Sequence, residues 1–172
     1  MQASEPATVR RLLTTAFADD GRVADLVEAL TARPEDVGLP LVAESAGTVV
    51  GYTQLSRGWI DADRQLVEAL VLSPLAVAPA HQRRGIGRAL SDAAVEQARQ
   101  LGAPAVFLEG DPKYYAKLGW QPAGAQGFTA PSVRIPDAAF QVVVLPARQP
   151  WMTGALVYND TFWSLDCVGL RR

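Results

Sequence analysis

The chain has 172 residues, of which 49% are hydrophobic and 20% are charged, and its formal net charge at pH 7 is −2. This length suits a single domain spanning 1–172. The weak charge gives no support for nucleic-acid binding, and no apolar stretch reaches the roughly 20 residues of a membrane span. One cysteine, Cys167, excludes an internal disulfide, and no secretory signal follows Met1. We therefore expect a cytoplasmic globular protein.

Two helices and a hairpin are predicted for the first third of the chain. Apolar residues at helical spacing predict a helix over 6–17 and a second helix over 23–30. Alternating segments at 41–45 and 49–55, separated by Ala46-Gly47, predict a β-hairpin. The polar stretch 57–64 is predicted to be a connecting segment.

The rest of the chain alternates strands with helices. A long strand ends at Val77, and Pro74 within it predicts a bulge or an edge. A helix over 88–101 leads to a short strand at 105–108, and a crossover of this length predicts a parallel pair. A short helix near 112–117 and strands at 140–145 and 154–158 complete the pattern. This order predicts a mixed sheet flanked by helices.

A glycine-rich basic loop, Gln82-Arg83-Arg84-Gly85-Ile86-Gly87, connects the long strand to the helix that follows it. A helix start presents unpaired backbone N–H groups and a partial positive charge, so anionic phosphates bind there readily. Gly85 and Gly87 leave the backbone accessible. Arg83, Arg84 and Arg88 can add charge-assisted contacts. The loop therefore predicts a phosphate site, although a basic turn without a ligand also fits it.

Two motifs resemble those of the GNAT superfamily of N-acyltransferases. The run 75–90 fills its acetyl-CoA signature, Gln/Arg-x-x-Gly-x-Gly/Ala after a Leu-x-Val-x-Pro strand end. The run 111–120 matches its Tyr-x-x-x-Gly-Phe/Trp element, and Leu-Glu-Gly-Asp-Pro at 108–112 resembles a bacterial subgroup of predicted N-acetyltransferases. Neither a Rossmann nor a Walker pattern occurs.

The resemblance extends over roughly 12–145 and is strongest over 41–145. It implies the GNAT fold, a mixed and mostly antiparallel central sheet flanked by helices, with a parallel strand pair splayed at the cofactor site. One departure is visible, since only 1–6 is available for the first strand of the family. We expect that strand to be absent or very short.

The resemblance also implies acetyl-CoA as cosubstrate, no metal, and a set of site residues. Tyr115 would be the general acid that protonates the CoA sulfur, the alternative being that Tyr114 and Tyr115 are packing residues. A bulge at Pro74 would free the backbone of 75–77 for the pantetheine arm. The implied cofactor-binding residues are Leu75, Ala76, Val77, Gln82, Arg83, Arg84, Gly85, Ile86, Gly87 and Arg88.

A general base is not evident. The position of the carboxylate found in some relatives is occupied by Val71. Glu44, Glu68 and Glu109 remain candidates, each with a solvated or salt-bridged carboxylate as the alternative. Trp59 is expected to approach the acceptor side of the cleft.

The implied function is acetyl transfer from acetyl-CoA to a primary amine of an unidentified acceptor, by direct attack of the amine on the thioester. The alternative is a catalytically silent acyl-CoA-binding module that acts as a sensor or interaction scaffold. A longer acyl chain, and a homodimer formed through the aromatic C-terminal segment, also remain open.

Overall fold

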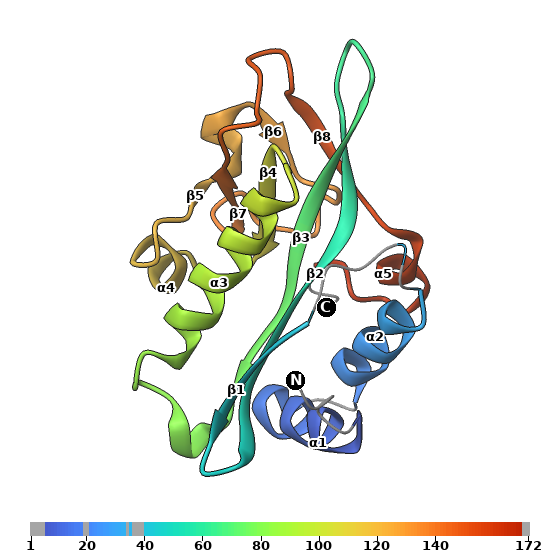
Figure 1. Cartoon of the computed structure of the whole chain (residues 1–172). Coiled ribbons are helices and arrows are strands. Elements are labelled where there is room, and N and C mark those ends of the chain that lie inside the picture. The colour runs from blue at the N-terminus through green and yellow to red at the C-terminus, as the bar shows by residue number, and fades with distance from the viewer. Residues whose placement is uncertain (1–5, 19–20, 34, 36–39, 170–172) are drawn as a thin grey trace.

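A mixed sheet with helices on both faces forms the molecule (Figure 1). The computed structural model describes residues 6–18, 21–33, 35 and 40–169. Its elements are α1 (Pro6–Phe17), α2 (Arg22–Thr31), β1 (Leu41–Ser45), β2 (Thr48–Asp61), β3 (Leu66–Val77), α3 (Ile86–Gln100), β4 (Ala105–Glu109), α4 (Pro112–Ala116), β5 (Gln121–Pro122), β6 (Phe128–Thr129), β7 (Phe140–Val144), β8 (Gly154–Tyr158) and α5 (Asp160–Ser164).

The strand order among the described residues is β5-β7-β4-β3-β2-β8-β6, and β1 pairs with the other part of β2. The β3–β4 and β6–β8 pairs are parallel, whereas the others are antiparallel. Tyr52 and Ala76 pack with α1 and α2 on one face. Gly51 lies against Leu90 and Ile86 of α3 on the other. The expected fold class is confirmed.

The first hairpin is longer than its sequence suggested. The stretch 57–64, predicted as a connecting segment, continues β2 as far as Asp61, and that prediction is wrong. Gly58 and Ile60 are buried and alternate with the half-buried Arg57 and Trp59, which is the period of a strand. The alternation is hard to recognise in the sequence, because only Gly58 and Ile60 face inward and charged residues lie close to them.

The C-terminal third completes the sheet and its core. The predicted strands at 140–145 and 154–158 are confirmed as β7 and β8. The strands β5 and β6 were not predicted, because two residues are too few to show a period, and the short helix α5 was also missed. The predicted absence of a first strand concerns 1–6, of which 1–5 lie outside the described residues.

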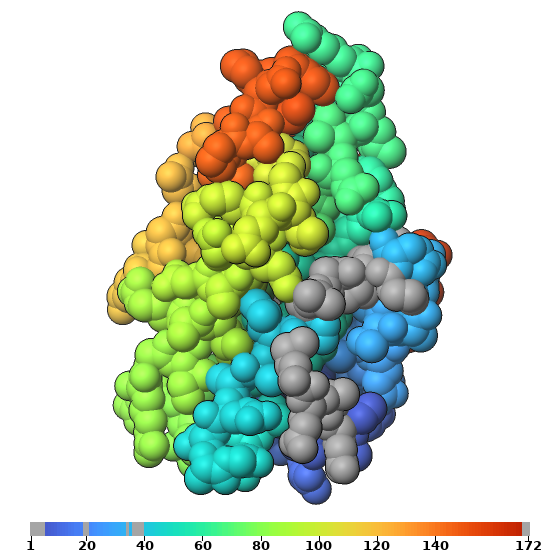
Figure 2. All heavy atoms as spheres, in the orientation of Figure 1, coloured from blue at the N-terminus to red at the C-terminus, as the bar shows by residue number. Residues whose placement is uncertain are grey.

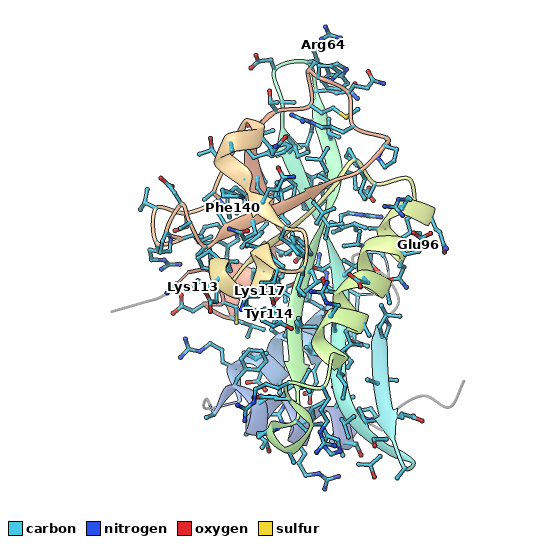
Figure 3. The ribbon with its side chains drawn as sticks, turned by 90° about the vertical axis from the view of Figure 1, so that its left-hand side faces the viewer. Arg64, Glu96, Lys113, Tyr114, Lys117 and Phe140 are labelled. Atoms are coloured by element: carbon cyan, nitrogen blue, oxygen red, sulfur yellow. The ribbon has the colours of Figure 1, made fainter. Side chains whose placement is uncertain are left out.

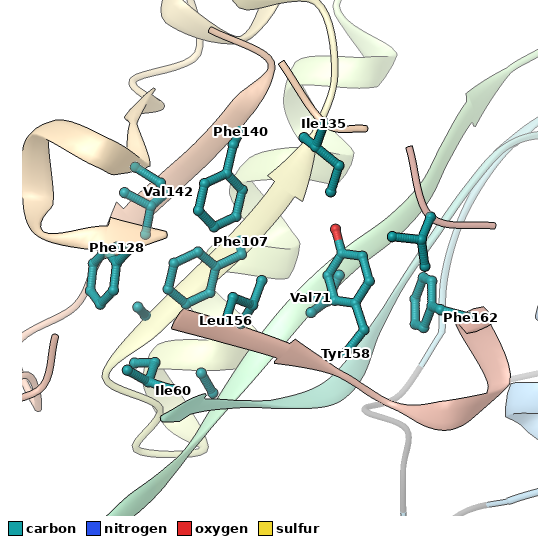
Figure 4. Close-up of a cluster of buried hydrophobic side chains, with 14 of the residues drawn as sticks. Ile60, Val71, Phe107, Phe128, Ile135, Phe140, Val142, Leu156, Tyr158 and Phe162 are labelled. Carbon is teal, nitrogen blue, oxygen red and sulfur yellow. The ribbon is translucent and has the colours of Figure 1, made fainter. Parts of the chain in front are cut away.

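Aromatic side chains from distant segments meet in the main core (Figure 4). The Phe107 ring of β4 contacts Phe128 edge-on, with centroids 4.9 Å apart, and stacks on Phe140 at 5.6 Å. Leu156 and Tyr158 of β8 belong to the same cluster. The C-terminal segment therefore packs on the face of the sheet opposite α3, which leaves the α3 side to the glycine-rich loop.

The parallel strands β3 and β4 pair only at two positions, Leu70 with Val106 and Val71 with Phe107. Beyond them β3 runs on to Val77 beside β2 alone. The pairing register with β2 shifts between Leu72 and Leu75, so the bulge predicted at Pro74 is confirmed. The predicted splay therefore begins immediately after Val71.

The fully buried Phe107 provides a test of this core. We expect Phe107→Ala to lower the free energy of unfolding by about 3–5 kcal/mol, because it removes a buried ring and leaves a cavity. Urea denaturation followed by circular dichroism measures the change. Val133→Ala at a fully exposed position is the control and should stay within about 0.5 kcal/mol. Equal effects of the two substitutions would contradict the packing described.

Candidate cofactor site and its surroundings

The loop between β3 and α3 owes its shape to two residues in left-handed backbone conformation. The 3₁₀ turn Pro79–His81 follows β3, and then Arg83 has φ 60° and Gly85 has φ 83°. Gly85 is the N-cap of α3 and has no side chain with which to cap it. Glycine adopts such a φ without steric cost. The sequence Arg-Gly-x-Gly thus produces an abrupt helix start that no side chain caps by a hydrogen bond within the described residues.

The first turn of α3 has open hydrogen-bond donors. The first bond of the helix ladder runs from the Ala89 amide to the Gly85 carbonyl, at 3.0 Å. The amides of Ile86, Gly87 and Arg88 precede it and have no partner within the helix. The loop 82–85 is exposed, and Figure 2 shows this region in light green on the lower left surface. Of the three residues that carry these amides, Arg88 is exposed, Ile86 is half-buried and Gly87 is buried. An anion would meet the positive end of the helix dipole and the unpaired amides of this turn here.

The basic and polar side chains of the motif divide into two groups. Arg83 and Arg84 are exposed and form no ion pair within the described part of the chain. The Arg88 guanidinium instead donates to the Lys117 carbonyl at 2.7 Å, and the Gln82 amide donates to the Val77 carbonyl at 3.1 Å. Arg83 and Arg84 are therefore available to a ligand, whereas Arg88 and Gln82 brace the loop through their side chains.

The strand end 75–77 keeps one edge of its backbone paired. Leu75, Ala76 and Val77 lie opposite 51–53 of β2. On this edge the release of the backbone that a bulge or splay was expected to cause does not occur, because its groups stay in the ladder with β2. What is open is the other edge, because β4 has already diverged and no described strand pairs with that edge of β3 beyond Val71.

Val77, Gly87 and Tyr114 converge beside this open edge. A β-carbon on Gly87 would overlap the Tyr114 hydroxyl and would lie 3.8 Å from Val77 Cγ2. Gly87 therefore has a packing reason to lack a side chain, in addition to leaving the first turn open. No local pattern indicates the Tyr114 contact, since the two residues are 27 positions apart along the chain.

Tyr115 points to a different place from Tyr114. Its ring lies directly against Gly110, the residue after β4, and contacts Trp120 edge-on at 5.9 Å. Burial, and secondarily the neighbouring Tyr114, raises the pKa of the Tyr115 hydroxyl above its ordinary value of 10. The hydroxyl therefore stays protonated at neutral pH, as a proton donor must.

The three candidate carboxylates are not brought together. Glu44 is exposed near the end of β1, and Glu68 forms an ion pair with Arg57 at 3.2 Å. Glu109 ends β4, and both its oxygens accept from the Gly169 amide, at 3.2 and 3.3 Å. Burial raises the pKa of the Glu109 carboxyl, an effect that this amide and Arg134 partly oppose. Glu109 lies at the end of β4 that has diverged from β3, whereas Glu68 precedes the paired residue Leu70 and lies away from the splay.

Trp59 and Gly51 are placed by β2. Trp59 lies within the strand, opposite Glu68 and Val157, rather than in a loop that could approach an acceptor.

Gly51 was not singled out from the sequence, yet a β-carbon there would lie 2.9 Å from Leu90 Cδ1 and 3.0 Å from Ile86 Cγ2. A glycine inside a strand is the signal that marks such a close approach. It lets the first turns of α3 sit against the sheet.

The overlap at Gly87 can be tested by a double-mutant cycle. Gly87→Ala should gain helix propensity, about 0.5–1 kcal/mol, but its methyl group displaces the Tyr114 hydroxyl. We expect Gly87→Ala to be more favourable in a Tyr114→Phe background, by a coupling energy of about 0.5–3 kcal/mol. Urea denaturation without ligand measures all four proteins. Equal effects in the two backgrounds would contradict the contact.

Comparison with known proteins gives consistent results. The family model described as acetyltransferase (GNAT) family matches residues 7–120. The chain is 32% identical over 164 residues to the uncharacterized N-acetyltransferase YjhQ of Escherichia coli (strain K12), an alignment that covers 91% of this chain and 88% of YjhQ. No helix within the described ranges has the length and apolar character to cross a membrane.

Two solved structures are similar over nearly the whole chain. A GNAT family N-acetyltransferase (YhbS) from Escherichia coli in complex with CoA has a TM-score of 0.79 and 25% identity, and the match covers 92% of this chain and 86% of that one. A GNAT family acetyltransferase from Brucella melitensis in complex with acetyl-CoA has a TM-score of 0.73 and 27% identity, with 94% of each chain covered. The motif at 82–87, the splayed sheet and the family match together lead to one conclusion: this chain belongs to the acetyltransferase (GNAT) family.

Proposed function

We propose that the protein is an N-acetyltransferase that transfers the acetyl group of acetyl-CoA to a primary amine. The observation that carries the proposal is the first turn of α3, which lies next to the open edge of β3. Three of its amides have no partner within the helix, and Arg83 and Arg84 form no ion pair with any described residue. A diphosphate fits the amides, and an extended arm that bears amide groups fits a free strand edge. The relatives in complex with CoA and acetyl-CoA support this choice of cosubstrate.

Direct transfer of the acetyl group gives roles to Tyr115 and Glu109. A neutral amine attacks the thioester carbonyl carbon, the C–N bond forms, the C–S bond breaks, and the amine gives up one proton. Tyr115 donates its proton to the departing sulfur, which balances the charge that develops there. Glu109, at the end of β4 that has diverged from β3, is the carboxylate we assign to accept the amine proton, directly or through water. In this proposal, residues 1–172 form one domain that acts in the cytoplasm.

A second candidate is a module that binds an acyl-CoA without turnover. The absence of a carboxylate at Val71 favours it, because a strongly basic amine needs a proton acceptor. Such a module would bind the cofactor as tightly as an enzyme but would release no thiol with any amine. The two candidates therefore differ in turnover and not in affinity.

The cofactor site is tested first by calorimetric titration with acetyl-CoA. We expect saturable binding by the native protein and none by Arg84→Glu/Gly87→Glu, because this variant places negative charge against the phosphates and fills the first turn of α3. Arg99→Glu near the other end of α3 is the control for a charge reversal and should bind normally. Absence of binding by the native protein would overturn the assignment.

The role of Tyr115 is tested by Tyr115→Phe. With an amine identified by thiol release, we expect kcat to fall about 10²–10⁴-fold while acetyl-CoA affinity is unchanged, because only the proton donor is lost. Because the raised pKa keeps the hydroxyl protonated, the native enzyme should not lose this donor between pH 7 and 10. A kcat equal to that of the native enzyme would leave Tyr115 a packing residue.

A further inference from the structure

The short helix α4 is fastened to the beginning of α3. The Asp111 carboxylate caps α4 by accepting from the Lys113 amide at 2.9 Å. Two bonds then join α3 to the segment that follows α4: Arg88 Nη2 to the carbonyl of the C-cap Lys117 at 2.7 Å, and Trp120 Nε1 to Ser91 Oγ at 3.0 Å. The second of these is buried. Side chains on α4 that face α3 are therefore held in place before any ligand arrives.

Tyr114 is the side chain that reaches the open first turn. Its hydroxyl occupies the space that a β-carbon of Gly87 would take, with Val77 at the end of β3 also beside that space. Figure 3 shows Tyr114 on α4 together with Lys113 and Lys117, next to α3. The hydroxyl thus lies where the strand end, the helix start and α4 meet.

The Tyr114 hydroxyl has no evident role in holding the fold together. Within the described part of the chain it makes no hydrogen bond, and Tyr114 is 40% exposed. The ring contacts Tyr115 edge-on at 5.0 Å, a contact that a phenylalanine would make equally well. Burial raises the pKa of Tyr114, an effect that Arg88 opposes, so the group is a protonated donor at neutral pH.

We propose that the Tyr114 hydroxyl donates a hydrogen bond to the diphosphate of bound CoA, so that α4 contributes a donor beside the amides of the α3 first turn. The inference rests on the proposed function, since it requires CoA at that turn. An oxygen bound by the amides of 86–88 lies at the helix start, and the hydroxyl over Gly87 is directed to the same place. Adjacent tyrosines then serve separate ends of the cofactor: Tyr114 its diphosphate, and Tyr115, against Gly110 at the splay, its sulfur.

The test compares native protein and Tyr114→Phe in calorimetric titrations with CoA and with 3′-dephospho-CoA. We expect about a tenfold loss of affinity for both ligands, the effect of one hydrogen bond to a charged group. Thr15→Ala, which removes an exposed hydroxyl from α1 on the opposite face of the sheet, should retain native affinity. An unchanged thermal midpoint of ligand-free Tyr114→Phe verifies that the fold is intact.

Phosphorus NMR of the saturated complexes identifies the group contacted. The diphosphate resonances of bound CoA should shift between native protein and Tyr114→Phe, while the 3′-phosphate resonance should not. Native affinity in Tyr114→Phe, a loss confined to CoA, or unshifted diphosphate resonances would each overturn the inference. If the native protein bound no CoA, the proposed function itself would fail, which is a different result from normal binding by both proteins.

Discussion

The divergence of β3 from β4 creates the opening around which the candidate cofactor site is built. Two parallel strands that share only the Leu70–Val106 and Val71–Phe107 pairs leave the remainder of β3 with one unpaired edge. Unpaired backbone groups need partners, either water or a ligand. The bulge opposite Thr53 and Leu55 lets β3 stay on β2 while it leaves β4. The sheet therefore has an open backbone edge in its interior, between β3 and β4, and not at an outer strand.

The helices around this opening are arranged by close contacts rather than by long-range charge. Gly51 lets α3 approach β2, and Gly87 leaves room for Tyr114. The Arg88–Lys117 and Ser91–Trp120 bonds then fix α4 beside α3. The proposed cofactor site is therefore formed by three separate segments, each held by contacts that do not involve the ligand. Such preorganisation lowers the entropy lost on binding.

The two faces of the sheet have different tasks in this arrangement. The α3 face holds the glycine-rich loop 82–87 and both tyrosines. The opposite face is closed by α1, α2 and the C-terminal segment, whose Leu156, Tyr158 and Phe162 pack with Phe107. Glu109 follows Phe107 by two residues, so it faces the C-terminal segment and bonds the Gly169 amide. An amine that reaches the thioester from this face would meet residues of the C-terminal segment. That segment contains neither the motif at 75–90 nor the motif at 111–120.

The sequence by itself determined the order of most elements, the glycine-rich helix start and the family, because these depend on local periodicity and on residues close together in the chain. It did not determine that β2 runs through 57–61, since there only Gly58 and Ile60 face inward and charged residues surround them. Only the tertiary structure decided that Arg88 and Gln82 brace the loop and that Tyr114 reaches Gly87. These contacts join residues on different elements, and no local pattern encodes the angle at which two elements meet.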